Sequence, residues 1–213
     1  MYVIPLWLFL LATAGGAALA TWIAVVAGIR PLEYAGKPAV ILALMAAAVS
    51  MTPASPTQRA FFIAAFALGL VSDVFLMLPR DMFMAGLAAA MVEHVLYIAG
   101  FRARAFDPTL FVVASVIAVA SVAVFLPPIQ RALRSSHPRL VLPVYAYVAV
   151  FVVMVASAGG SGSLVALAGA LLFFYSDAIL AWNRFVRPVR FGRIVNIVPY
   201  HVGQILLALS LVL

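Results

Sequence analysis

The stretch GALLFFYSDAILAWNRF, residues 169–185, is apolar along most of its length but contains one carboxylate, Asp177. An earlier stretch, LGLVSDVFLMLPR at residues 68–80, places Asp73 in the same setting, and both stretches contain the pattern Ser-Asp-x-x-Leu. Only six Asp and Glu residues occur in the whole chain, so two of them lie inside apolar runs. Such runs are typical of membrane-spanning helices, where a carboxylate normally faces the protein interior or a cavity.

The composition of the whole chain excludes a soluble protein. Apolar residues make up 67% of the 213 residues, charged residues make up 9%, and the mean hydropathy is +1.21. A soluble domain of this size has too small an interior to hide that much apolar surface, so the surrounding solvent is lipid. The absence of cysteine excludes disulfides and thiolate chemistry. The formal charge of +7 is expected to orient loops across a membrane rather than to bind nucleic acid.

The breaks between apolar runs predict an all-α, polytopic membrane protein that forms one domain over residues 1–213. A membrane span needs about 20 apolar residues, or fewer where neighbouring helices cover its ends. The first run has no basic residues before it and continues to residue 29, so it is predicted to be a retained span rather than a signal peptide. The eight predicted helices cover residues 3–29, 37–51, 59–78, 82–101, 109–126, 140–158, 163–182 and 194–213.

The basic residues predict which way the chain lies in the membrane. Ten of the thirteen Lys and Arg residues fall at the end of the bundle where helix 1 joins helix 2, and three fall at the opposite end. Because cytoplasmic loops are enriched in Lys and Arg, we expect the first end to be cytoplasmic and both termini to be non-cytoplasmic. The expected location is a bacterial inner membrane. The ten residues are Arg30, Lys37, Arg80, Arg131, Arg134, Arg139, Arg184, Arg187, Arg190 and Arg193.

The two Ser-Asp patterns indicate an internal duplication. They lie 104 residues apart, on the third and seventh predicted helices, which run in the same direction. Each Asp is followed seven residues later by an Arg, and a His follows on the next helix, His94 in one case and His201 in the other. This spacing predicts two parallel four-helix repeats with a site between them.

The predicted depths of the polar residues indicate one pocket. Asp73 and Asp177 each lie about six residues from the cytoplasmic end of their predicted helices, which is roughly 9 Å at 1.5 Å per residue. Two carboxyls at one level can share a proton, giving one neutral acid and one anion. The alternative is that each Asp only makes structural hydrogen bonds between helices. Further polar residues expected at nearly this depth or deeper are Glu93, His94, Tyr97, Tyr200, His201 and Gln204, and Asn196 lies on one polar stripe with Tyr200 and Gln204.

Other polar residues allow plainer interpretations. Lys37 either extends its amine toward the membrane surface or contributes to the pocket. Ser72 and Ser176 are expected to bond to carbonyls of their own helices. No tight metal-binding pattern such as His-Glu-x-x-His occurs, so no metal or other cofactor is expected.

The motifs resemble those of the YhhN family of eight-span membrane proteins. The resemblance rests on LVSDVFLMLP, EHVLYIAGF, GALLFFYSDAILAWNRF and PYHVGQILLALS in order, with Lys37-Pro38 before them, and covers the chain from about residue 30 to its end. It implies a lysoplasmalogenase, an ether hydrolase that cleaves the vinyl ether bond of lysoplasmenyl-choline or -ethanolamine. The products would be a fatty aldehyde and glycerophospho-choline or -ethanolamine. The implied partners are the lysophospholipid substrate, water and membrane lipids.

The same resemblance implies roles for individual residues. Asp73 and Asp177 match the family's catalytic aspartates, while Lys37 and Arg184 are expected to hold the phosphate. The chain departs from the family at Ser72, where glycine is common, and at His201. A proton-coupled transporter or a lipid-binding carrier is the alternative, since buried carboxylates occur there too. The expected substrate-binding residues are Lys37, Glu93, His94, Tyr97, Asn183, Arg184, Tyr200, His201 and Gln204.

Overall fold

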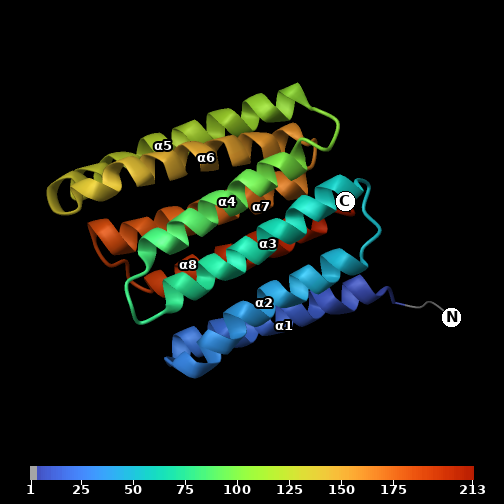
Figure 1. Ribbon diagram of the computed structural model, residues 1–213, viewed down its shortest axis with the longest axis horizontal. Helices are drawn as coiled ribbons and strands as arrows, with labels where there is room; N and C mark the ends of the chain where they lie inside the picture. The colour runs from blue at the N-terminus through green and yellow to red at the C-terminus, as the bar shows by residue number, and fades with distance from the viewer. Residues whose placement is uncertain (1–3) are drawn as a thin grey trace.

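Only helices and the turns between them occur in residues 4–213, the part of the chain that the computed structural model describes (Figure 1). Among these residues seven helices, α7 being counted with the π-helical turn after it, are long and apolar enough to cross a membrane, and α8 is not among the seven. A 3₁₀ turn at Pro138–Leu140 precedes α6, and a π-helical turn at Trp182–Val186 extends α7. The helices are α1 Leu6–Ala27, α2 Arg30–Ser50, α3 Pro56–Met77, α4 Phe83–Phe101, α5 Pro108–Ser136, α6 Val141–Gly160, α7 Leu164–Ala181 and α8 Gly192–Leu209.

These helices confirm the all-α prediction, although the second helix starts earlier than predicted. It was expected to begin at residue 37, but α2 begins at Arg30, so Lys37 lies two turns inside it. Pro31 stands in the first turn, where its missing N–H breaks no helical hydrogen bond. The segment that was interpreted as a polar break therefore carries Arg30 and Glu33 on the same helix as Lys37.

The fifth helix is longer than predicted for a related reason. Pro127 and Pro128 indicated an end at residue 126, but α5 continues through both of them to Ser136. The extra turns bury Ile129 and Leu133 against α6, and this packing offsets the hydrogen bonds that the prolines remove. Residue 3, where the first predicted helix starts, lies outside the described residues, and α1 begins at Leu6.

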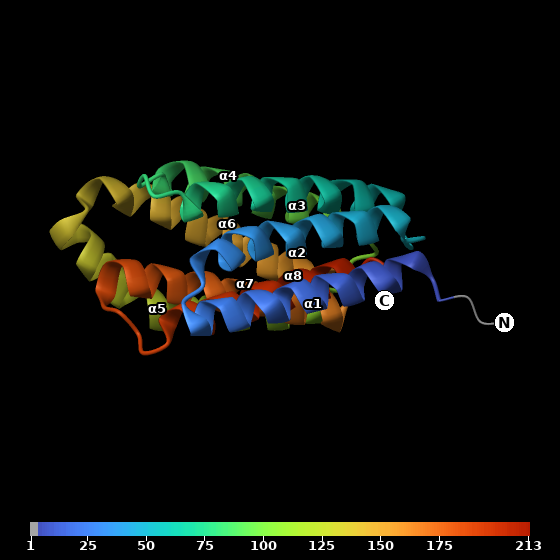
Figure 2. The same cartoon turned by 90° about the horizontal axis from the view of Figure 1, so that it is seen from below.

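Seven of the eight helices form a ring, and the remaining helix, α5, packs outside it. Successive helices pair as the hairpins α1/α2, α3/α4, α5/α6 and α7/α8. The ring runs α1, α2, α3, α4, α6, α7 and α8 and closes where α8 packs on α1, while α5 lies outside against α6 and the π-helical turn (Figures 1 and 2). Pairs α1/α2 and α5/α6 therefore lie on opposite sides of the bundle, as Figure 1 shows.

The helices that carry the two aspartates begin in the same way. The Ser55 side chain accepts a hydrogen bond from Gln58 N at the start of α3, and the Ser163 side chain accepts one from Ala166 N at the start of α7. Such caps satisfy backbone N–H groups that have no partner within the helix. Each Asp lies four residues before the last residue of its helix, at the opposite end from these caps.

A pair of glycines sets the distance between α7 and α8. A Cβ atom added to Gly169 would lie 2.9 Å from the carbonyl oxygen of Gly203, and one added to Gly203 would lie 2.9 Å from that of Gly169. Small residues at a membrane helix contact allow the backbones to approach closely. This approach helps to bring the polar residues of α8 beside those of α7.

Replacing Gly203 with alanine is expected to destabilise the fold by about 1–3 kcal/mol, because the added methyl group meets backbone that cannot rotate away. The measurement is the unfolding midpoint of the purified protein in detergent. Gly16→Ala is the matched control, since no other heavy atom lies within 4 Å of a Cβ at Gly16. Equal stability of the two variants would contradict close packing of α7 on α8.

Candidate active site

A cavity of about 440 Å³ lies inside the bundle, and both aspartates line it. Residues from α2 to α8 contribute to its wall. It extends from Arg30 and Arg193, at the end of the bundle where α2 and α8 begin, inward to Glu93. The predicted juxtaposition of the third, fourth, seventh and eighth helices around one space is therefore present.

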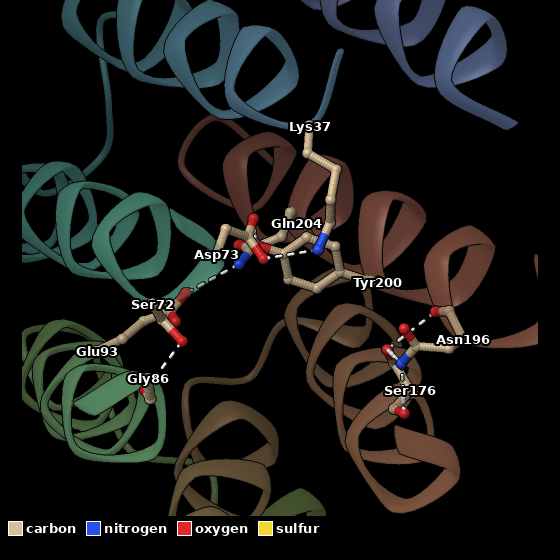
Figure 3. Close-up of polar contacts among 9 residues, drawn as sticks. All are labelled: Lys37, Ser72, Asp73, Gly86, Glu93, Ser176, Asn196, Tyr200 and Gln204. Carbon is tan, nitrogen blue, oxygen red and sulfur yellow. Dashed lines mark hydrogen bonds and ion pairs between the residues drawn. The ribbon is translucent and has the colours of Figure 1, made fainter. Parts of the chain in front are cut away.

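Asp73 is held by one cation and one hydroxyl. Lys37 Nζ donates to its Oδ1 at 2.9 Å, and the Tyr200 hydroxyl donates to its Oδ2 at 2.7 Å (Figure 3). The side chain of Asp73 is 7% exposed and that of Lys37 is 15% exposed. Of the two interpretations for Lys37, contribution to the pocket is the one observed. Asp73 and Lys37 thus form a nearly buried ion pair with a charge-assisted hydrogen bond.

Asp177 has different partners. The Tyr147 hydroxyl donates to Asp177 Oδ2, and His94 Nε2 lies 2.8 Å from the same hydroxyl and 3.9 Å from Oδ2. No Lys or Arg of residues 4–213 forms an ion pair with Asp177. The hydroxyl can donate to a carboxylate or accept from a neutral carboxyl, so this arrangement fits both protonation states of Asp177.

A third carboxyl, Glu93, lines the same cavity. Gln204 Nε2 donates to Glu93 Oε1 at 2.8 Å, and the Tyr97 hydroxyl donates to Gln204 Oε1 at 2.7 Å. All three side chains are essentially buried. Gly69 leaves space for the carboxyl, because a Cβ there would lie 2.6 Å from Glu93 Oε1. Tyr97 and Gln204 thus position Glu93 from behind the cavity wall.

The serines before the aspartates bond across helices rather than within them. Ser72 Oγ donates to the carbonyl of Gly86 on α4, and Ser176 Oγ donates to the carbonyl of Asn196 on α8, each at 2.9 Å (Figure 3). Asn196 Nδ2 donates back to the Ser176 carbonyl at 2.8 Å. The expectation of bonds to their own helices was wrong, because the next helix offers carbonyls at equal reach. The serines therefore tie each Asp helix to its hairpin partner.

Two predicted residues near the end of α7 do not line the cavity. Arg184 binds Asp81 at 2.7 Å and stacks on the Phe83 ring. Its hydrogen bond to Asp81 lowers the pKa of that carboxyl below its ordinary value, with help from the Phe83 N–H. The Asn183 side chain accepts a hydrogen bond from Val189 N at 2.8 Å and so closes the turn before α8.

His201 also lies away from the cavity. Its Nδ1 accepts a hydrogen bond from Trp22 Nε1 of α1 at 3.1 Å, and the side chain is fully buried. Its role here is a contact that closes the ring between α8 and α1. The departure from the family pattern at this position thus coincides with a helix contact rather than with the cavity.

Sequence reasoning missed much of the cavity wall, including several polar residues. Tyr147 lies in the apolar run VYAYVAVFVV, where a tyrosine is more often an interface or packing residue. Glu33 and Arg193 form an ion pair although 160 residues separate them, and Arg30 lies beside them in the wall. The sequence gave no usable signal for Tyr147, because burial is not visible in a single sequence.

The partners of the aspartates follow a crossed pattern. Asp73 on α3 is bonded from α2 and from α8, while Asp177 on α7 is bonded by Tyr147 on α6 and lies near His94 on α4. Each aspartate thus has one partner from the second helix of its own half and one from the fourth helix of the other half. Neither half of the chain completes either environment alone.

Fold and site together define the class of protein: a helical membrane protein with a carboxyl-lined internal cavity. Residues 32–211 match the YhhN family, and the chain belongs to this family. The human protein named Lysoplasmalogenase TMEM86B is 32% identical over 146 residues, which are 66% of this chain and 58% of that protein. The proteins of the same name from rat and pig are 33% and 34% identical over 147 and 143 residues, again 66% of this chain and 56% and 58% of theirs.

The chain spans somewhat less than two thirds of the length of these curated relatives. No solved structure matches it. The family assignment confirms the resemblance seen in the motifs, and the relatives' name gives the lead for function.

Proposed function

We propose that this protein hydrolyses the vinyl ether bond of lysoplasmalogens, the lysoplasmenyl-choline or -ethanolamine lipids. Membership of the YhhN family and the name of the relatives support a lysoplasmalogenase. The observation that carries the chemistry is the pair of aspartates with unlike partners in one cavity. Vinyl ether hydrolysis needs a proton donated to carbon and an anion beside the oxocarbenium ion that follows, which is a division that paired carboxyls provide.

The partners of each aspartate suggest which role it takes. Asp73, paired with Lys37, is the anion that stabilises the oxocarbenium carbon and accepts a proton from the attacking water. Asp177, without a Lys or Arg partner in residues 4–213, is the neutral acid that protonates the other alkene carbon. Tyr147 and His94 position Asp177.

The proton balance closes over one turnover. Asp177 gives its proton to the alkene carbon, and water adds to the oxocarbenium carbon as Asp73 takes a proton from it. The resulting hemiacetal then breaks its bond to the glycerol oxygen. That oxygen takes the proton from Asp73, and the hemiacetal hydroxyl returns a proton to Asp177. One water is consumed, and one aldehyde and one glycerophospho-base are released.

The orientation and the ancestry of the chain belong to the same proposal. The cavity reaches the end of the bundle that carries ten of the thirteen Lys and Arg residues, which supports a cytoplasmic opening and non-cytoplasmic termini. The crossed partners of the aspartates and the matching bonds of Ser72 and Ser176 support two four-helix repeats within one domain.

Purified protein incubated with a lysoplasmenyl lipid is expected to release fatty aldehyde, whereas the saturated alkyl ether analogue is expected to stay intact because it has no alkene to protonate. The measurement is aldehyde formation by mass spectrometry. The transporter alternative would be favoured if neither lipid released aldehyde and liposomes containing the protein took up the intact lipid.

A further inference from the structure

The two ends of the cavity differ in chemistry. At one end the wall is formed by the first turns of α2 and α8, with charged side chains. Across the bundle from α2, on the side where α5 lies, the wall is formed by apolar residues of α4, α5 and α6 (Figure 1). The three carboxyls described above come from α3, α4 and α7, which lie between these ends. The apolar wall includes Leu87, Val122, Phe125, Ile129 and Val148.

The charged end holds one anion and two cations. Arg193 of α8 forms an ion pair with Glu33 of α2, and Arg30 lies one turn before Glu33. The Glu33 side chain is only 14% exposed, whereas the Arg193 side chain is 56% exposed. A carboxylate this covered needs a cation partner, whereas an exposed guanidinium such as that of Arg193 can exchange one anion for another.

We infer that this charged end binds a zwitterionic headgroup, a phosphate ester that carries an ammonium group. The phosphate takes the guanidinium groups of Arg30 and Arg193, and the ammonium replaces Arg193 beside Glu33. The exchange leaves no charge unpaired, because one internal ion pair is replaced by two pairs with the ligand. The inference rests on the proposed function, which supplies the lysolipid substrate. It adds the residues that select the headgroup of that lipid.

The cations expected to bind the phosphate from sequence are engaged elsewhere. Lys37 is paired with Asp73, and Arg184 is paired with Asp81 outside the cavity wall. Arg30 and Arg193 are the arginines that line the cavity in the described chain. With the headgroup on them, the apolar chain extends toward α5, and the ether bond between the two lies near the aspartates.

The test is binding of two saturated-ether lysolipids with and without the choline group, a 1-alkyl-glycerophosphocholine and a 1-alkyl-glycerol phosphate. Glu33→Gln is expected to weaken binding of the choline lipid about tenfold, the loss typical of one charge-assisted contact, and to leave the phosphate lipid unchanged or tighter. Arg193→Gln is expected to weaken both. Binding is measured by calorimetry in detergent, so the result does not depend on any turnover.

Matched controls come from the same end of the molecule. Asp81→Asn removes a carboxylate from another Arg pair, and Arg190→Gln removes a guanidinium, and neither residue lines the cavity. Both should bind the two lipids as the unmodified protein does. Free glycerophosphocholine competing as well as the intact lipid would show that the site is built for the soluble product rather than for a lipid headgroup.

Equal weakening of both lipids by Glu33→Gln, or no weakening of the choline lipid, would overturn the inference. If Glu33→Gln does not yield monodisperse protein, Arg193→Gln decides alone, because unchanged binding of the phosphate lipid would also overturn it. Failure of the proposed hydrolysis is a separate outcome, in which lipids bind with this selectivity but no aldehyde forms.

Discussion

Asp177→Asn is expected to lower the rate of aldehyde release by about a thousandfold, within the range that a positioned general acid contributes. Asparagine keeps the size of the side chain but cannot deliver a proton to carbon. Because Asp177 has neutral or weakly basic partners in Tyr147 and His94, the substitution leaves no cation unpaired and the fold should persist. The measurement is single-turnover aldehyde formation by protein of verified monodispersity.

Two further variants sharpen this prediction. Tyr147→Phe keeps the ring and removes the hydroxyl between His94 and Asp177, so a smaller loss of about tenfold to a hundredfold is expected. Asp81→Asn lies outside the cavity wall and should hydrolyse normally. A folded Asp177→Asn protein that released aldehyde at the normal rate would refute the assignment of the acid.

Lys37→Met is expected to destabilise the protein by about 3–5 kcal/mol, because it leaves the Asp73 carboxylate buried without its cation. The Asp73 side chain is 7% exposed, so without the ammonium group its charge keeps one protein donor, the Tyr200 hydroxyl. Stability is measured from denaturant unfolding in detergent. Activity should fall as well, since an Asp73 that must take a proton can no longer serve as the anion.

A double variant separates this effect from general loss of packing. Asp73→Asn in the Lys37→Met background removes the unpaired charge and is expected to recover most of the lost stability while remaining inactive. Tyr200 would still bond the new amide oxygen. If the stability loss of the double variant equalled the sum of the losses of the two single variants, Lys37 and Asp73 would stabilise the fold independently.

The existence and order of the helices could be predicted from sequence because apolar runs and short polar breaks alternate along the chain. The prediction failed where a helix continues past the apolar run. Residues 30–36 and 127–136 contain prolines and arginines that are typical of loops, yet they extend α2 and α5. At the end of α5 the arginines can face water while Leu133, on another face of the same helix, is buried. Composition alone does not show which face each residue takes.

The site was partly predictable for a different reason. Asp73 and Asp177 are conspicuous because carboxylates are costly in lipid, and depth along equivalent helices indicated that they share a cavity. Tyr147 is not conspicuous, because tyrosine is common in such helices. The pairing of Glu33 with Arg193 depends on the contact between α2 and α8, which no local pattern records.

The crossed partners of the two aspartates bear on how such a protein could originate. Two identical four-helix subunits, joined about a twofold axis, would have to surround both aspartates in the same way. Once the halves are joined in one chain, each can change alone, and here Asp73 has a lysine where Asp177 has a tyrosine and a histidine. If the two proposed repeats arose by such a fusion, it would allow a division of labour between twin residues that symmetry forbids.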